Sequence, residues 1–304
     1  MTVFNRKAKQ LQKDRAALSP DFEEYQYLRK EVGSRLTDRL HDMLDRKFPD
    51  VLELGCGGSS VVPYLESVPG VESVVRLNSS DIQLQQDPEP QASSKLKVHK
   101  VLGDEESLPF AKHSFDLVVS NLSLHWVNDL PGVFRQVQQV LKPDGLFLAS
   151  MFGEATLWEL RNAFLVGEQE REGGISNHVS PFAGVADIGD LLTRARFGLP
   201  TVDQESIVVD FKDPFVLMKE LRLMGESNAQ LSRRPYVPRD TFYAAAAAYK
   251  ALYGKPNGGV PATFQIVYLI GWSPHPSQQQ ALSPGSAKAS MKEFSQQVGE
   301  FKTL

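Results

Sequence analysis

The amino-acid sequence predicts an α/β fold in which a doubly wound, mostly parallel sheet carries helices on both faces. Short runs rich in β-branched and aromatic residues alternate with segments whose apolar residues recur at helical spacing. Strands that alternate with helices in this way form parallel sheets joined by crossover helices. A glycine-rich stretch directly follows the first predicted strand, which is where such sheets bind ligands.

Seven segments are expected to form the strands of this sheet. They are 51–55, 72–78, 95–102, 115–121, 145–151, 206–211 and 262–272. Between the fourth and fifth of these strands, apolar residues at helical spacing predict a helix, which Pro143 and Gly145 end.

Two further helices are expected between the last two strands. Asp213 and Asp240 are typical of helix N-termini, and Gly225 and Gly254 are typical stops. The resulting helical insertion, at about 212–260, is the only sizeable segment placed to cover the carboxyl ends of the strands. We therefore expect a lid that also docks a protein substrate.

Three parts are expected along the chain: a helical segment 1–45, the α/β domain 46–272 and a mobile tail 273–304 rich in Pro, Ser, Gln and Ala. The basic N-terminus is either the remnant of an organellar transit peptide or a solvated helix. We favour the helix, because serine is nearly absent there and Val3 and Phe4 are placed to pack.

The composition excludes several classes of protein. A net charge of −4 over 304 residues gives no reason to expect nucleic acid as a partner. Cys56 is the only cysteine, so neither a disulfide framework nor a cysteine-based metal site is expected, and it is interpreted as packing under the glycine loop. No apolar run reaches the roughly 18 residues that span a bilayer.

The glycine stretch VLELGCGGSS (51–60) is a poor match to the common phosphate-binding loops. A dinucleotide fingerprint needs glycine at Ser60, and a P-loop needs Gly-Lys-Ser/Thr, which does not follow. A nucleoside ligand without phosphates is the alternative that remains.

Four sequence motifs, in this order along the chain, indicate which nucleoside is bound. They are ELGCGG (53–58), GDEESLPF (103–110), SFDLVVSNLSLHWV (114–127) and LKPDGLF (141–147). Together they resemble the class I S-adenosylmethionine-dependent methyltransferases from about residue 45 to residue 151. The resemblance implies a class I methyltransferase-like, seven-stranded sheet and S-adenosylmethionine as cofactor.

The resemblance also implies roles for residues at the ends of the strands. Glu53 and the backbone at Gly55 and Gly57 would lie against the methionine part of the cofactor. Asp104 and Glu105 would meet the adenine, with the Asp104 carboxylate accepting from its amine.

Two positions depart from the methyltransferase pattern. Asn78 stands where an acidic residue usually accepts both ribose hydroxyls, and an amide has a single acceptor oxygen. Ser59 replaces the third glycine of the loop. We therefore expect weak cofactor binding that Asn78→Asp would tighten. Asn121 to His125 would cap the crevice.

A closer resemblance covers nearly the whole chain. It rests on NLSLHWVNDLP (121–131), MFG (151–153), LWELR (157–161), EREGGIS (170–176), HVSPF (178–182), LMGESNA (223–229), RDTFYAAAAAYKALY (239–253) and VPATFQIVYLIGW (260–272). This combination resembles the mitochondrial complex I assembly factors of methyltransferase fold, which are arginine hydroxylases of an iron–sulfur subunit. Malonyl-carrier-protein O-methyltransferases are a sister family.

That family implies work in the mitochondrial matrix, peripheral to the inner membrane, at an early stage of complex I assembly. The implied partners are an iron–sulfur core subunit and a small accessory assembly protein. The residues themselves name no oxidant, because none of the six histidines heads a His-x-Asp/Glu metal motif. No metal ligands are therefore predicted.

Candidate substrate residues lie at the mouth of the crevice and in the insertion. His125 and Trp126 are either substrate-facing groups or a packed aromatic pair. Glu170, Glu172 and Glu226 are either acceptors for a guanidinium or part of a solvated face, and Glu226 is the best candidate because it follows a helix-stopping glycine.

Three functions are therefore expected in this order. The first is an assembly-factor enzyme that hydroxylates an arginine, and the second is an O-methyltransferase on a carrier-bound carboxylate. The third is a non-catalytic assembly chaperone, which Asn78 and Ser59 favour over a strong methyltransferase, whereas Asp104 favours a bound nucleoside.

Overall fold

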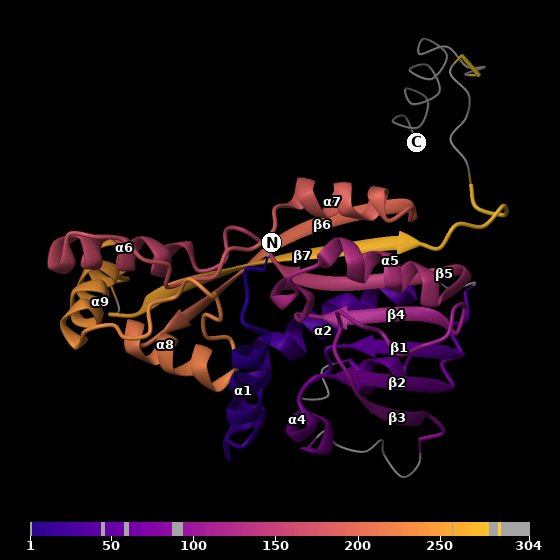
Figure 1. Cartoon of the computed structure of the whole chain (residues 1–304), viewed down its shortest axis with the longest axis horizontal. Coiled ribbons are helices and arrows are strands. Elements are labelled where there is room, and N and C mark those ends of the chain that lie inside the picture. The colour runs from indigo at the N-terminus through magenta and orange to yellow at the C-terminus, as the bar shows by residue number, and fades with distance from the viewer. Residues whose placement is uncertain are drawn as a thin grey trace, which may run out of the picture. The chain divides into compact units, whose positions relative to one another are not determined.

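A single seven-stranded sheet organises the computed structural model, with the strand order β3–β2–β1–β4–β5–β7–β6 (Figure 1). The strands are β1 (Asp50–Leu54), β2 (Ser73–Asn78), β3 (Lys97–Leu102), β4 (Phe115–Asn121), β5 (Leu141–Phe152), β6 (Gly198–Phe211) and β7 (Val260–Trp272). The first five run parallel, and β7 pairs antiparallel with both β5 and β6. The predicted doubly wound fold is confirmed.

The structure describes residues 2–43, 46–57, 61–86, 94–256, 258–279 and 285–286. Met1–Pro274 forms one compact unit, and His275–Leu304 forms a second one. Ser59 and most of the predicted tail lie outside the described residues, so their expected roles stay predictions.

The helices cover both faces of the sheet. They are α1 (Arg6–Ala17), α2 (Tyr27–His41), α3 (Val62–Leu65), α4 (Asp81–Gln86), α5 (Leu130–Val140), α6 (Trp158–Glu172), α7 (Val185–Arg194), α8 (Pro214–Leu223) and α9 (Arg239–Tyr253). Short 3₁₀ turns occur at Phe22–Gln26 and Leu124–Trp126. Among the described residues, none of the helices has the length and apolar character that a bilayer span requires.

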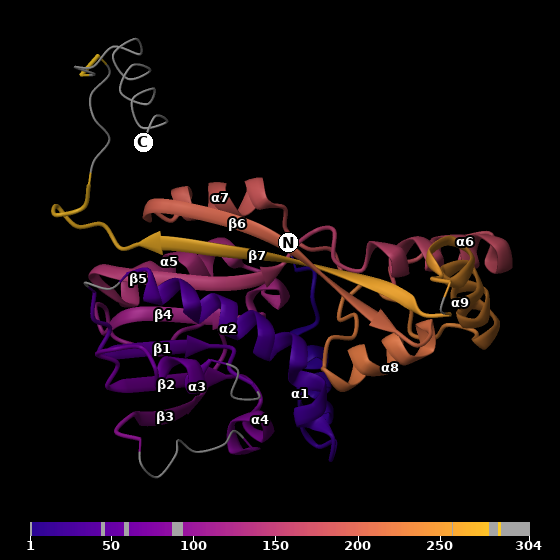
Figure 2. The ribbon, with the colours of Figure 1, turned by 180° about the vertical axis from the view of Figure 1, so that it is seen from behind.

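Alternate residues of the central strands pack on opposite layers of helices. Val51 of β1 belongs to the same buried cluster as Leu36 of α2, whereas its neighbour Leu52 clusters with Phe134 of α5. Figure 1 shows α5 and α7 on one face, and Figure 2 shows α2 and α3 on the other. The two apolar layers hold the strand ends in fixed positions.

The insertion after β6 packs on α6 as a helical cluster at one end of the β6–β7 hairpin (Figure 1). Gly167 of α6 lies so close to α9 that a side chain there would place Cβ 2.6 Å from the Ala245 nitrogen. The alanine run 244–248 therefore permits close helix packing, as its composition predicts.

Two strands begin at least four residues earlier than the sequence indicates. β6 starts at Gly198 and β5 at Leu141, instead of 206 and 145. Most residues of β6 are exposed, because this edge strand pairs only with β7 and carries polar side chains. Without a buried face, its first half lacks the apolar alternation that marks a strand.

Candidate functional site

Helix α1 lies across the carboxyl ends of the strands, where the sequence predicts the cofactor. It packs between α4 and α8, as both views of the ribbon show (Figures 1 and 2). Asn5 caps its first turn by accepting from the Ala8 amide at 2.9 Å. Its basic residues Arg6 and Lys13 reach the loops that follow β3 and β4.

The glycine loop after β1 packs closely on the protein itself. Gly55 has a φ of +68°, and a Cβ there would lie 1.9 Å from the Ser123 hydroxyl oxygen and 2.9 Å from a Glu105 carboxylate oxygen. Only glycine fits such a position without strain. Gly57 has more room, since the nearest atom to an added Cβ is Gln83 Oε1 at 3.1 Å.

Glu53 lies on β1 beside a basic residue of the neighbouring strand. Its carboxylate accepts from Arg76 Nε at 2.8 Å, and both side chains are fully buried. The parallel register places the two residues directly opposite each other. In this structure the carboxylate neutralises a buried cation in the sheet.

The Asn78 amide fixes the glycine loop onto α4. Its nitrogen donates to the Cys56 carbonyl and to Gln83 Oε1, the latter at 2.8 Å, and its oxygen accepts from the Ser80 amide at 3.0 Å. The side chain is fully buried. Both of its polar groups therefore have partners within the chain.

The two acidic residues after β3 hold a guanidinium from α1. Arg6 Nη2 lies 2.6 Å from Asp104 Oδ1 and also pairs with Glu105. Glu105 further accepts from Ser123 Oγ at 3.0 Å and lies 3.6 Å from Lys13 Nζ. Burial alone would raise the pKa of Glu105, but Lys13 and Arg6 outweigh it and lower the pKa to about 2.

The cleft fits S-adenosylmethionine only in part. Asp104 keeps 42% of its side chain exposed, so it can still accept from an adenine amine. Glu105 forms ion pairs with Arg6 and Lys13. The nitrogen and the oxygen of the Asn78 amide both form hydrogen bonds within the chain. A bound nucleoside that needs these two side chains requires α1 to move and the loop after β2 to rearrange.

Asn121 ends β4 and ties the strand to its neighbours. Its nitrogen donates to the Arg29 carbonyl and its oxygen accepts from Ser150 Oγ, each at 2.8 Å. Leu122 then adopts a φ of +47°, which turns the chain sharply into the 3₁₀ turn that carries His125. A left-handed leucine at this position is a strained turn next to the crevice.

The structure brings together three of the five candidate substrate residues, His125, Trp126 and Glu226. Trp126 Nε1 donates to Glu226 Oε2 at 2.7 Å, and His125 Nε2 lies 3.5 Å from the same oxygen. Two cations also approach Glu226: Arg29 Nη2 lies 3.4 Å from Oε1, and Lys9 Nζ lies 3.9 Å from Oε2. The Lys9 ammonium also lies over the Trp126 ring.

Burial and charge shift the pKa values of this cluster. Burial lowers the pKa of Lys9 to about 7, although Glu226 partly opposes the shift. Burial also lowers the pKa of His125, so its imidazole is neutral at pH 7. For Glu226, burial raises the pKa, but Lys9, His125 and Arg29 outweigh it and hold the pKa well below its usual range.

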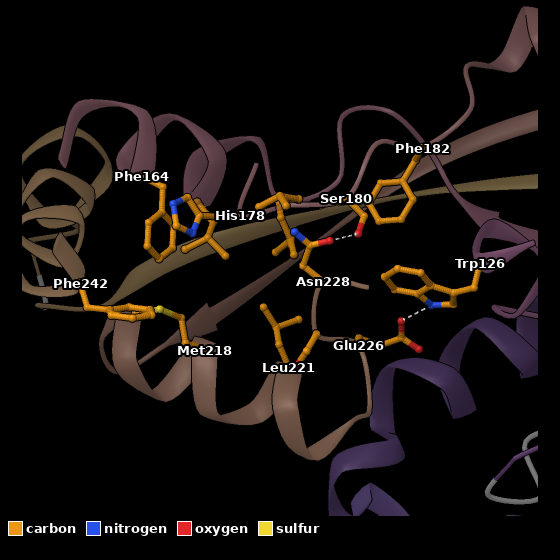
Figure 3. Close-up of a pocket in the computed structure, with 14 residues that line it drawn as sticks. Trp126, Phe164, His178, Ser180, Phe182, Met218, Leu221, Glu226, Asn228 and Phe242 are labelled. Carbon is orange, nitrogen blue, oxygen red and sulfur yellow. Dashed lines mark hydrogen bonds between the residues drawn. The ribbon is translucent and has the colours of Figure 1, made fainter. Parts of the chain in front are cut away.

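A cavity of about 250 Å³ opens between this cluster and the helical insertion (Figure 3). Apolar and aromatic side chains form most of its wall, and Glu226 lies at one end next to Trp126. Asn228 and Ser180 hydrogen bond to each other at 3.0 Å on the lining. The cavity thus combines apolar walls with one acidic end.

The other two candidate glutamates do not line this cavity. Glu172 forms an ion pair with Arg234 at 2.6 Å and accepts from Thr241. Glu170 is exposed on the same helix. The structure instead buries Glu168, which pairs with Arg234 and His178 behind the cavity.

Comparisons with known proteins agree with this geometry. Residues 52–149 match the model of a methyltransferase domain. A putative methyltransferase from Bacillus halodurans aligns with a TM-score of 0.52 and 15% identity, over 79% of this chain and 99% of the other. The YcgJ protein of Bacillus subtilis gives 0.51 and 14%, over 78% and 99%. The chain is therefore a protein of methyltransferase fold.

Proteins of similar sequence show to which family of methyltransferase fold the chain belongs. The mitochondrial arginine-hydroxylase NDUFAF5 of Danio rerio is 46% identical over 100% of this chain and 92% of the relative. The Homo sapiens protein of the same name is 45% identical over 97% and 84%. A malonyl-[acyl-carrier protein] O-methyltransferase of Xylella fastidiosa is 33% identical over 81% of each chain. The chain belongs to the NDUFAF5 arginine-hydroxylase family, as the sequence motifs indicate.

Proposed function

We propose that this chain hydroxylates an arginine of an iron–sulfur core subunit of complex I, early in the assembly of that complex. The relatives of the family carry the words arginine-hydroxylase and mitochondrial in their names. The sequence resemblance supports work in the matrix, peripheral to the inner membrane. It also supports the core subunit and a small accessory assembly protein as partners.

The observation that carries the proposal is the chemistry of the cavity. An arginine side chain has an apolar stem and a planar cation with several donors. Leu160, Met218 and Leu221 offer apolar contact to the stem, and Glu226 is the one carboxylate among the described residues that line the cavity. A guanidinium at that end would find the acceptor it needs.

A substrate guanidinium would join two cations that already surround Glu226. The first is the Arg29 guanidinium, which lies 3.4 Å from Glu226 Oε1. The pKa of Lys9 is about 7, however, so this ammonium releases its proton at little cost. We therefore expect Lys9 to become neutral when the substrate arginine enters, which keeps the local charge balanced.

Hydroxylation inserts an oxygen atom into a C–H bond, which oxidises the substrate by two electrons and therefore requires an oxidant. No group of three or more His, Cys, Asp or Glu side chains within the described part of the chain is placed to hold a metal ion. The roles that follow from the geometry are those of binding and orientation. Glu226 holds the guanidinium, and Trp126 fixes the Glu226 carboxylate.

S-adenosylmethionine is the cofactor that the methyltransferase-domain match supports. Gly55, Gly57 and Asp104 are the residues that would hold it. When bound, it supplies an electrophilic methyl group. Because Arg6 and Lys13 engage Glu105 and the Asn78 amide is fully used, we expect binding to be weak.

A non-catalytic assembly chaperone is the second candidate. It is favoured by α1, which covers the cofactor cleft with ion pairs from Arg6 to Asp104 and Glu105. Mass spectrometry of complex I subunits from cells with and without this protein separates the two functions. The proposal predicts an arginine that carries one extra oxygen atom only when the protein is present. A chaperone would change assembly and leave every arginine unmodified.

A further inference from the structure

A groove lies beside the cavity on the outer side of the helical insertion. It runs between α8 and α9 and has a volume of about 470 Å³. Met218 and Phe242 line both the groove and the cavity. Figure 3 shows these two side chains next to each other, at the end of the cavity opposite Trp126. A chain bound in the groove would therefore lie beside the cavity wall furthest from Trp126.

Two aromatic side chains lie exposed along this groove. Phe215 is 41% exposed and Tyr243 is 63% exposed, and their ring centroids are 5.6 Å apart in an edge-to-face contact. Large aromatic rings left exposed together are typical of surfaces that bind another protein. The groove therefore offers apolar contact area to a partner.

Three basic residues surround the aromatic pair. Lys219 and Arg222 on α8 and Arg239 on α9 line the groove, and all three are exposed. None of them has an ion-pair partner among the residues that the structure describes. Elsewhere on the surface, by contrast, Arg35 of α2 pairs with Glu205 of β6 at 2.7 Å. The groove thus carries positive charge that the described chain does not neutralise.

We propose that this groove binds an acidic segment of the substrate protein, adjacent to the arginine that enters the cavity. The inference rests on the proposed function, because the cavity supplies the position of the arginine. Carboxylates of the segment would pair with Lys219, Arg222 and Arg239, and its apolar side chains would lie on Phe215 and Tyr243. The basic groove selects for acidic neighbours, whereas Glu226 selects for the arginine itself.

Fluorescence anisotropy with three labelled peptides tests this assignment. The first contains one central arginine flanked by glutamates, the second has glutamines in place of the glutamates, and the third has citrulline in place of arginine. We expect the glutamine peptide to bind roughly tenfold more weakly, because exposed ion pairs each contribute a modest gain. Raised salt should weaken the binding of the two acidic peptides more than that of the glutamine peptide, because their ion pairs in the groove are exposed.

Charge-reversal variants locate the contact. The combination Lys219→Glu, Arg222→Glu and Arg239→Glu should weaken the binding of both acidic peptides by about tenfold or more. The affinity for the glutamine peptide should not fall to the same extent. Lys250→Gln, an exposed position on α9 outside the groove, is the matched control and should leave binding unchanged. Circular dichroism confirms that each variant folds.

The three peptides test the groove assignment and the role of Glu226 in the cavity separately. Equal binding of the acidic and glutamine peptides, or equal binding to the charge-reversed and wild-type proteins, overturns the groove assignment. Equal binding of the arginine and citrulline peptides overturns the role of Glu226 but leaves the groove intact. Each site is thus tested by its own comparison.

Discussion

The ammonium nitrogen of Lys9 lies 3.3 Å from the centre of the Trp126 ring. Lys9 also donates to the carbonyls of Gly225 and Ser227, at 2.9 Å and 3.1 Å, and is only 2% exposed. A helix near the N-terminus is therefore part of the same site as the loop after β4 and the loop after α8.

The buried Lys9 should make stability depend on pH in the alkaline range. Its pKa falls from 10.5 to about 7 in the folded chain, so between these values the unfolded chain binds the extra proton. Stability therefore rises with pH across this window, by up to about 1.4 kcal/mol per pH unit. The measurement is urea unfolding of the wild type and Lys9→Met at several pH values.

The difference in unfolding free energy between the two proteins should change as pH rises, since Lys9→Met lacks the titrating group. Lys7→Met, at an exposed position of the same helix, is the control and should follow the wild type. If the wild type and Lys9→Met keep a constant difference in unfolding free energy from pH 7 to pH 10, Lys9 has an ordinary pKa and the proton-release step fails.

Asn78→Asp should destabilise the protein, whereas the sequence alone predicts tighter cofactor binding by this variant. The Asn78 nitrogen donates to the Cys56 carbonyl and to Gln83, and an aspartate has no donor for either. A buried carboxylate would then face two acceptor oxygens, at a cost of about 1–3 kcal/mol or more. Thermal unfolding measures the loss, with Asn162→Asp on the exposed face of α6 as control.

Calorimetry measures how Asn78→Asp changes the affinity for S-adenosylmethionine. Tighter binding by a stable Asn78→Asp protein would show that the amide is free to turn toward a ribose. The structure instead predicts weaker binding, because the variant loses the contact that fixes the glycine loop.

Arg6→Ala should strengthen the binding of S-adenosylmethionine. The substitution removes the guanidinium that pairs with Asp104 and Glu105, and it loosens α1 over the cleft. We expect a gain of several-fold in affinity by calorimetry, since about 1 kcal/mol corresponds to roughly fivefold. Arg15→Ala, exposed on the same helix, should have no effect. An unchanged or lower affinity of Arg6→Ala would mean that α1 does not compete with the cofactor.

The sequence predicts the sheet because its signals are local. Buried strands such as β4 carry continuous apolar runs, and glycine and proline mark where the neighbouring helices end. For the edge strand β6, the sequence predicts only residues 206–211, because the first half of the strand is mostly exposed and has no alternation of apolar and polar residues. The order of the strands follows from the resemblance to the methyltransferases.

The site was predicted only in part, because its members are distant in sequence. Trp126 and Glu226 are in contact across 100 residues, whereas the sequence singles out each of them as a candidate without predicting this contact. Lys9 and Arg29 were missed, because no local pattern marks an N-terminal cation that folds onto a loop far along the chain. Conversely, Asn78 matched a cofactor position by alignment, yet its side chain is used within the protein.

Replacement of Glu226 tests the central claim most directly. Glu226→Gln leaves Arg29 and Lys9 without their carboxylate, which is expected to destabilise the fold by several kcal/mol. The double variant Glu226→Gln with Lys9→Met therefore serves as the charge-balanced form. Thermal unfolding establishes that it folds before any activity is judged.

The decisive measurement is mass spectrometry of the iron–sulfur core subunit from cells whose own protein is replaced by the wild type or by the double variant. The account predicts an arginine with one added oxygen atom in wild-type cells. In cells with the folded double variant, the same arginine should stay unmodified, because no carboxylate holds its guanidinium. A fully hydroxylated arginine in those cells would contradict the assignment of Glu226 as the residue that binds the substrate.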